Sequence, residues 1–92
     1  MMVKVRFRGP LASRLTTEVF KVQMPSASNL RELLDLLITQ YDGVRNIWDS
    51  PDRVERDVLL LLNEVDIGLL EGLETILHED DLLTILPLIH GG

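Results

Sequence analysis

The last two residues of the sequence, Gly91 and Gly92, follow the apolar stretch Leu82 to Ile89 and one histidine, His90. Glycine loses more conformational freedom on folding than any other residue, and it has no side chain to bury, so this pair cannot help a core. A terminal glycine does present an α-carboxylate with no Cβ beside it, which another protein's active site could approach closely. We therefore expect the chemistry of this chain at the carboxylate of Gly92, on an extended tail.

Other residues that could carry chemistry support weaker hypotheses. His90 could orient the terminus, but no base lies near it in the sequence, so we interpret it as a polar tail residue. His78 precedes the acidic run Glu79 to Asp81, and these four residues together could hold a metal ion. A solvated turn is the simpler interpretation, so no metal site is expected. The chain has no cysteine, no Ser-His-Asp set and no glycine-rich phosphate loop, so no catalytic residue is expected.

Composition indicates one small globular domain. The chain has 92 residues, of which 46% are apolar, enough for a single core. Its net charge of −6 argues against direct nucleic-acid binding, and Lys4, Arg6 and Arg8 form too small a basic stripe for that role. The sequence shows no cysteine, no signal-peptide pattern and no apolar segment of about 20 residues, which predicts a cytoplasmic protein without a membrane partner.

Periodicity predicts the elements of the first half. Residues 3–8 and 18–24 alternate between apolar and polar side chains, as half-buried strands do, and their closeness indicates a hairpin. Residues 30–41 show the apolar stripe of an amphipathic helix. Asn29 and Glu32 have the spacing of a capping box at its start, and Gly43 is a candidate cap at its end.

The second half predicts two more strands, over residues 58–62 and 82–87. Residues 44–57 indicate a loop with a short helical turn that holds Ile47 and Trp48 on the core. Residues 63–66 indicate a turn into a very short strand, and residues 69–73 a helical turn. Strand pairing is expected to weaken at Pro87, which has no N–H. This element order predicts an α+β domain with one main helix on one face of a sheet.

Both ends of the sequence resemble a known superfamily. The start, VKVRFRGPLASRL, resembles Urm-type ubiquitin-related modifiers. The end shares several features with these and with the small subunit of molybdopterin synthase: an Asn in a turn after an apolar strand (Asn63), a Gly-Leu-x-Thr stretch (Gly72, Leu73, Thr75), an acidic turn and Gly-Gly. The chain is thus similar to ubiquitin-like sulfur carriers and modifiers, which include the thiamine sulfur carrier and small archaeal modifier proteins, and it is most similar to the Urm-type branch.

The resemblance implies both a fold and a function. The implied fold is the β-grasp, a mixed sheet of four to five strands on one main helix, forming a single domain (residues 1–92) with a body (1–86) and a flexible tail (87–92). The implied function begins when an adenylating enzyme uses ATP to activate Gly92. A sulfur donor then converts the carboxylate to a thiocarboxylate, and a tRNA thiolase or the large subunit of molybdopterin synthase accepts the sulfur. No cofactor is bound permanently.

The reach of the tail sets a requirement on the body. From Pro87 to Gly92 an extended chain spans at most about 20 Å, enough to enter a cleft in another protein. Ordering it costs about 1–2 kcal/mol per residue, so contacts by the body must offset that cost. One helix cannot cover both faces of the leucine-rich strands. We therefore predict a docking face at Leu60, Leu62 and Leu82, or their alternates, unless the loop carrying Trp48 or a second copy covers them.

Other functions stay open at this stage. Gly92 could be joined to lysines of target proteins, which is compatible with sulfur carriage; the chain's own lysines are Lys4 and Lys21. The chain could instead be the small, non-catalytic subunit of molybdopterin synthase. It could also be a plain protein-interaction module in which Gly92 has no role.

Overall fold

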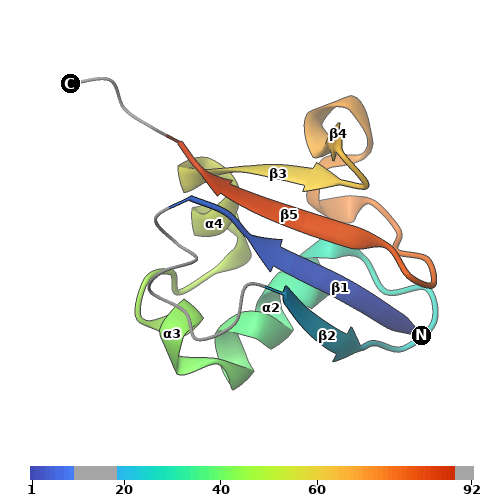
Figure 1. Cartoon of the computed structure of the whole chain (residues 1–92), viewed down its shortest axis with the longest axis horizontal. Helices are drawn as coiled ribbons and strands as arrows, with labels where there is room; N and C mark the ends of the chain where they lie inside the picture. Colours follow the sequence, from blue (N-terminus) through green and yellow to red (C-terminus); the bar gives the residue numbers. More distant parts are fainter. Residues whose placement is uncertain (10–18, 89–92) are drawn as a thin grey trace.

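The computed structural model describes residues 1–9 and 19–88 of the chain. The described elements are shown in Figure 1. In chain order they are β1 (Met2–Phe7), β2 (Val19–Gln23), α2 (Leu30–Gln40), α3 (Asp42–Arg45), α4 (Pro51–Asp57), β3 (Val58–Leu62), β4 (Val65–Asp66), the 3₁₀ helices η1 (Ile67–Leu69) and η2 (Gly72–Glu74), and β5 (Leu82–Pro87).

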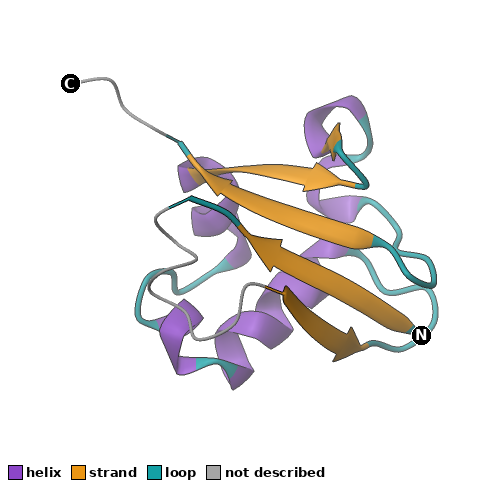
Figure 2. Cartoon of the chain, viewed as in Figure 1, coloured by secondary structure: helices purple, strands orange, loops and turns teal. Residues whose placement is uncertain are grey.

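The strands form one mixed sheet in the order β2-β1-β5-β3-β4. β1 pairs antiparallel with β2, confirming the predicted hairpin, and parallel with β5, which pairs antiparallel with β3. The first and last strands are therefore neighbours in the middle of the sheet, and Figure 2 shows the main helix crossing one side of it. This arrangement confirms the predicted α+β, β-grasp fold.

The main helix α2 begins as predicted. The Asn29 side chain accepts a hydrogen bond from the N–H of Glu32 at 2.9 Å, and the N–H of Asn29 donates to the Glu32 carboxylate at 3.1 Å, which completes the capping box. The prediction for its end is wrong. Tyr41, in an extended conformation, caps α2, and Gly43 lies inside α3, because a new helix starts at once and no left-handed residue is needed.

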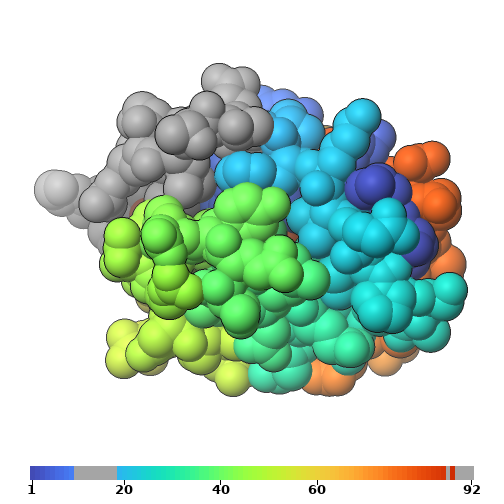
Figure 3. All heavy atoms as spheres, turned by 90° about the horizontal axis from the view of Figure 1, so that it is seen from below, coloured from blue at the N-terminus to red at the C-terminus, as the bar shows by residue number. Residues whose placement is uncertain are grey.

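Residues 44–57 are more ordered than predicted, since they contain the end of α3 and all of α4. Ser50 caps α4 by accepting a hydrogen bond from the N–H of Arg53, and Pro51 occupies its first turn. Trp48 is 4% exposed, which confirms that this segment packs on the core. Figure 3 views the molecule from below, where the teal to green residues of α2 and α3 cover much of the surface.

The core lies between α2 and one face of the sheet. Every apolar position of the predicted helix stripe up to Ile38 is buried, and so are the inward residues of β1, β3 and β5. In the described residues no helix is both long and apolar enough to cross a membrane, and the longest, α2, has 11 residues.

Candidate functional site

Strand β5 brings the C-terminal segment to one end of the sheet. Its last residue, Pro87, pairs with Val58 at the start of β3. The N–H of Leu88 then lies 3.5 Å from the carbonyl oxygen of Asp57. In Figure 1 this end of β5 lies beside the junction of α4 and β3. His90, Gly91 and Gly92 lie outside the described residues, so their roles stay predictions.

The predicted docking face is partly wrong. Leu60 and Leu62 are only 2% and 6% exposed, because they point from β3 into the core. Side chains alternate along a strand, so Leu59 and Leu61 lie on the opposite side of the sheet, where both are partly exposed. Leu82 is also partly exposed on that side. On β3, Leu59 and Leu61 are therefore available to a partner, whereas the predicted Leu60 and Leu62 are not.

The side of the sheet opposite α2, termed the open face, has an apolar half and a positive half. Lys4 pairs with Leu82 in the parallel ladder and with Lys21 in the antiparallel one. The pairing thus places like charges opposite each other on β1 and β2, next to apolar side chains on β5 and β3. The partly exposed leucines of this face are Leu59, Leu61, Leu82 and Leu86, and its cations are Lys4, Arg6 and Lys21.

Arg6 covers the middle of the open face. Its Nη2 donates to the Thr84 hydroxyl at 3.0 Å and pairs with the Glu64 carboxylate at 2.6 Å. Thr84 is 1% exposed although it lies on the open face, since the arginine lies over it. The Nε of Arg6 is buried with no hydrogen-bond partner among the described residues. The predicted basic stripe is therefore not simply solvated, because Arg6 is held against the sheet.

The turn after β3 fixes the start of β5. Asn63 has a φ of +51°, a left-handed conformation that asparagine tolerates better than most residues. Its side chain accepts a hydrogen bond from the N–H of Leu82 at 2.9 Å and donates one to Asp81 at 2.8 Å. Its own N–H donates to the Leu82 carbonyl at 2.8 Å. These bonds set where β5 starts, and hence where this strand of six residues ends, at Pro87.

The acidic turn before β5 is used for hydrogen bonding. Glu79 accepts a bond from the N–H of Met2 at 2.6 Å, and Asp81 accepts one from the N–H of His78 at 2.8 Å. The Nδ1 of His78 lies farther off, 3.9 Å from Asp81. Within residues 1–9 and 19–88 no three His, Cys, Asp or Glu side chains gather as metal ligands. The turn thus joins the starts of β1 and β5.

Two comparisons with known sequences match almost the whole chain. A model described as the ThiS family matches residues 5–92. The ubiquitin-related modifier 1 homolog of Caenorhabditis elegans is 30% identical over 95 residues, which cover 98% of this chain and 95% of that protein.

Solved structures show the same fold. Small archaeal modifier protein 1 of Methanosarcina acetivorans matches with a TM-score of 0.77 and 27% identity, over 99% of this chain and 96% of that one. A chain in the complex of subunits 1 and 2 of the molybdopterin-converting factor of Helicobacter pylori matches with a TM-score of 0.65 and 27% identity, over 100% of both chains. Because these matches cover almost the whole chain, the entire fold is shared with these structures and not one part of it.

Substitution of Asn63 tests its role at the start of β5. Asn63→Ala removes two side-chain hydrogen bonds and leaves a residue that disfavours positive φ, so we expect a loss of about 1–2 kcal/mol in the free energy of unfolding. Asn63→Gly relieves the backbone cost and should lose less. Urea unfolding of the three proteins measures both effects. Wild-type stability in Asn63→Ala would show that the turn does not hold β5.

Proposed function

Because the chain belongs to the ThiS family, whose members are small ubiquitin-like carrier proteins and not catalysts, we propose that it carries sulfur on the carboxylate of Gly92. A partner adenylating enzyme joins this carboxylate to the α-phosphate of ATP and releases pyrophosphate. A sulfur donor then displaces AMP, and the resulting thiocarboxylate delivers its sulfur to an accepting enzyme. The chain itself needs no bound cofactor, because the partner binds the ATP.

The observation that best supports this proposal is the position of β5. Its backbone pairs with β1 from Leu82 to Ile85 and with β3 from Leu83 to Pro87, so β5 is held in the sheet to its last residue. Leu88, directly after it, is 45% exposed. A reaction at residue 92 therefore requires no rearrangement of the sheet, and a partner can bind the body and the terminus together.

The open face is the docking surface that we propose for the adenylating enzyme. Leu59 and Leu86 are register partners on this face, one residue before the end of β5. Fully burying a leucine is worth about 1.5–3 kcal/mol, so covering several partly exposed ones offsets much of the ordering cost of a tail. The cations on β1 and β2 favour acidic residues in the partner, which raises the rate of association.

The sulfur acceptor is a separate question. The similar chain in the Helicobacter pylori complex supports a second candidate function, in which this chain is the small subunit of a molybdopterin-converting complex. The similarity to ubiquitin-related modifier 1 and to a small archaeal modifier supports tRNA thiolation, or attachment to lysines, as uses of the same activated Gly92. The cytoplasmic location stays a prediction.

Removal of Gly92 tests the proposed chemistry. The purified chain is incubated with its adenylating enzyme, ATP and a sulfur donor, and its intact mass is measured. The wild type should gain the mass difference between sulfur and oxygen, whereas the Gly92 deletion should show no gain and unchanged thermal unfolding. A wild type that never gains this mass contradicts sulfur carriage, and a deletion that retains every activity indicates a plain interaction module.

Leu82→Ser tests the docking surface. The change removes apolar area from the open face, and we expect the KM of the adenylating enzyme for this chain to rise about tenfold, the effect of about 1.4 kcal/mol. Leu36→Ser is the matched control, because Leu36 is also a partly exposed leucine but lies on α2. Equal KM values for the two variants would place the docking surface elsewhere.

A further inference from the structure

A second exposed apolar surface lies away from the end of β5. Among the described residues, six large apolar side chains are at least 40% exposed, and four of these lie between residues 65 and 76. The four are Val65 (40%), Leu69 (81%), Leu70 (42%) and Ile76 (46%). Isolated exposed leucines are ordinary, but a group on one short segment indicates an interaction site.

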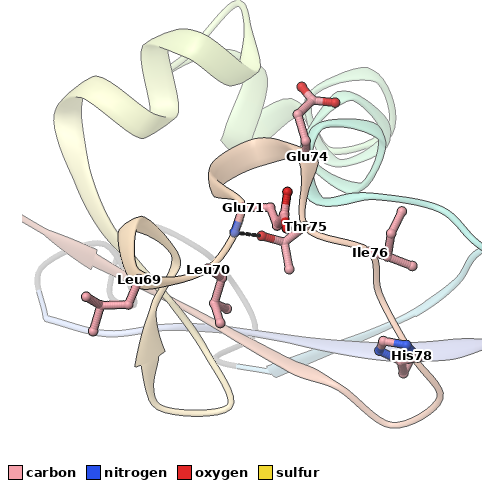
Figure 4. Close-up of a pocket in the computed structure, with 7 residues that line it drawn as sticks. All are labelled: Leu69, Leu70, Glu71, Glu74, Thr75, Ile76 and His78. Carbon is pink, nitrogen blue, oxygen red and sulfur yellow. Dashed lines mark hydrogen bonds between the residues drawn. The ribbon is translucent and has the colours of Figure 1, made fainter.

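These side chains line two adjoining hollows, of about 590 and 290 Å³. The hollows share four lining residues, Leu70, Thr75, Ile76 and His78, and together form what we term the η groove. Figure 4 shows the residues that line the larger hollow, which follow one another along η1, η2 and the segment leading to β5. The larger hollow lies within the range of about 300–1,000 Å³ that is typical of ligand pockets, and the smaller one lies just below it.

The wall of the groove is fixed before anything binds. Ile67, Leu73 and Leu77 are 4%, 4% and 2% exposed, so the segment is anchored in the core on both sides of its exposed residues. The hydroxyl of Thr75 accepts a hydrogen bond from the N–H of Glu71 at 3.0 Å, which is drawn in Figure 4. The same hydroxyl donates a hydrogen bond to the carbonyl of Gly72 at 2.7 Å. A partner therefore meets a preorganised surface, and little binding energy is lost in ordering it.

The groove is distinct from the open face. Val65 pairs with Leu62, whose side chain points to the helix side of the sheet, whereas Leu61 lies on the open face. His78 precedes β5, which spans about 17 Å from Leu82 to Pro87. A segment bound in the groove thus leaves the end of β5 and the open face free.

Charge indicates what kind of segment fits. All nine Lys and Arg residues of the chain lie in residues 1–56. Residues 57–92 contain eight acidic residues and no Lys or Arg. In the groove, Glu74 is already paired with the Nε of Arg31 at 3.1 Å, and it is the main cause, with Asp52, of a raised pKa of that guanidinium. The carboxylate of Glu71 has no ion pair or hydrogen bond within the described residues. A cation on a bound segment could therefore pair with the Glu71 carboxylate, which lies beside the apolar residues of the groove.

We propose that the η groove binds a short segment of a partner protein in which a bulky apolar side chain lies next to a lysine or arginine. The apolar side chain packs on Leu70 and Ile76, and the cation pairs with Glu71. A partner protein bound in the η groove would leave Gly92 accessible to a second partner protein. The inference stands on the groove alone and does not require the chemistry proposed at Gly92.

A selection from random peptides tests this directly. A phage-displayed library of random eight-residue peptides is selected on the full chain and, in parallel, on Leu70→Asp. Peptides enriched only on the wild type should share an apolar residue beside Lys or Arg. Amide shifts on titration with the best synthetic peptide should change mainly from residue 69 to residue 78. No enrichment over Leu70→Asp, acidic enriched peptides, or shifts centred on the open face would overturn the proposal.

Two variants keep the result specific. Glu71→Lys should weaken the selected basic peptide at least tenfold and strengthen the same peptide with its cation replaced by Glu. Leu88→Asp is the matched control for Leu70→Asp, because the two leucines are 45% and 42% exposed and only Leu70 lines the groove. Equal loss of peptide binding in both leucine variants, with unchanged thermal unfolding, would contradict a groove-specific site.

Discussion

The parallel pairing of β1 with β5 is the contact on which the rest of the structure depends. It joins residues as far apart in sequence as Arg6 and Thr84, which are separated by 78 positions. On one side of these two strands, Val5, Leu83 and their inward neighbours are at most 1% exposed beneath α2. On the other side, the same pairing sets cations beside leucines. One set of backbone hydrogen bonds therefore contributes both to the core and to the open face.

The sequence predicts those elements whose signals are local. The capping box at Asn29 gives the start of α2, and the strict alternation after Met2 gives β1. Helix α4 was not predicted because it has seven residues and buries only Pro51 and Val54, too few for a periodic stripe. Its only clear signal was Ser50 before a proline, which favours a helix start as much as a break.

The inward side of β3 could not be read from the sequence, because five consecutive apolar residues contain no alternation. Pairing with β5, which lies about 20 residues later in the sequence, decides which side of β3 faces the core. Leu60 pairs with Ile85 and Leu62 with Leu83, and both residues of β5 are buried. Strand order depends on the same kind of long-range pairing, and the η groove depends on the burial of Leu73 and Leu77 in the core. Lys21 was also missed as part of the candidate site, since only the register of the hairpin places it beside Lys4.

The residues behind the family resemblance prove to shape turns. Asn63 joins the turn after β3 to β5, Gly72 has a φ of +59°, and Leu73 is buried. Thr75 closes the turn around η2 through its hydroxyl. These residues hold the body in one form, while the proposed reaction takes place outside it. In the proposed function, partners therefore recognise the body, and the reaction takes place at the terminus.

The most direct test of this account is the chemical state of the C-terminus in protein isolated from its native cell. The protein is treated at once with an alkylating reagent that labels thiocarboxylates, and its C-terminal peptide is analysed by mass spectrometry. The account predicts chains that end at Gly92, a fraction of them labelled on a terminal sulfur. Chains that continue uncleaved beyond Gly92, or that end there without ever carrying sulfur, would contradict it.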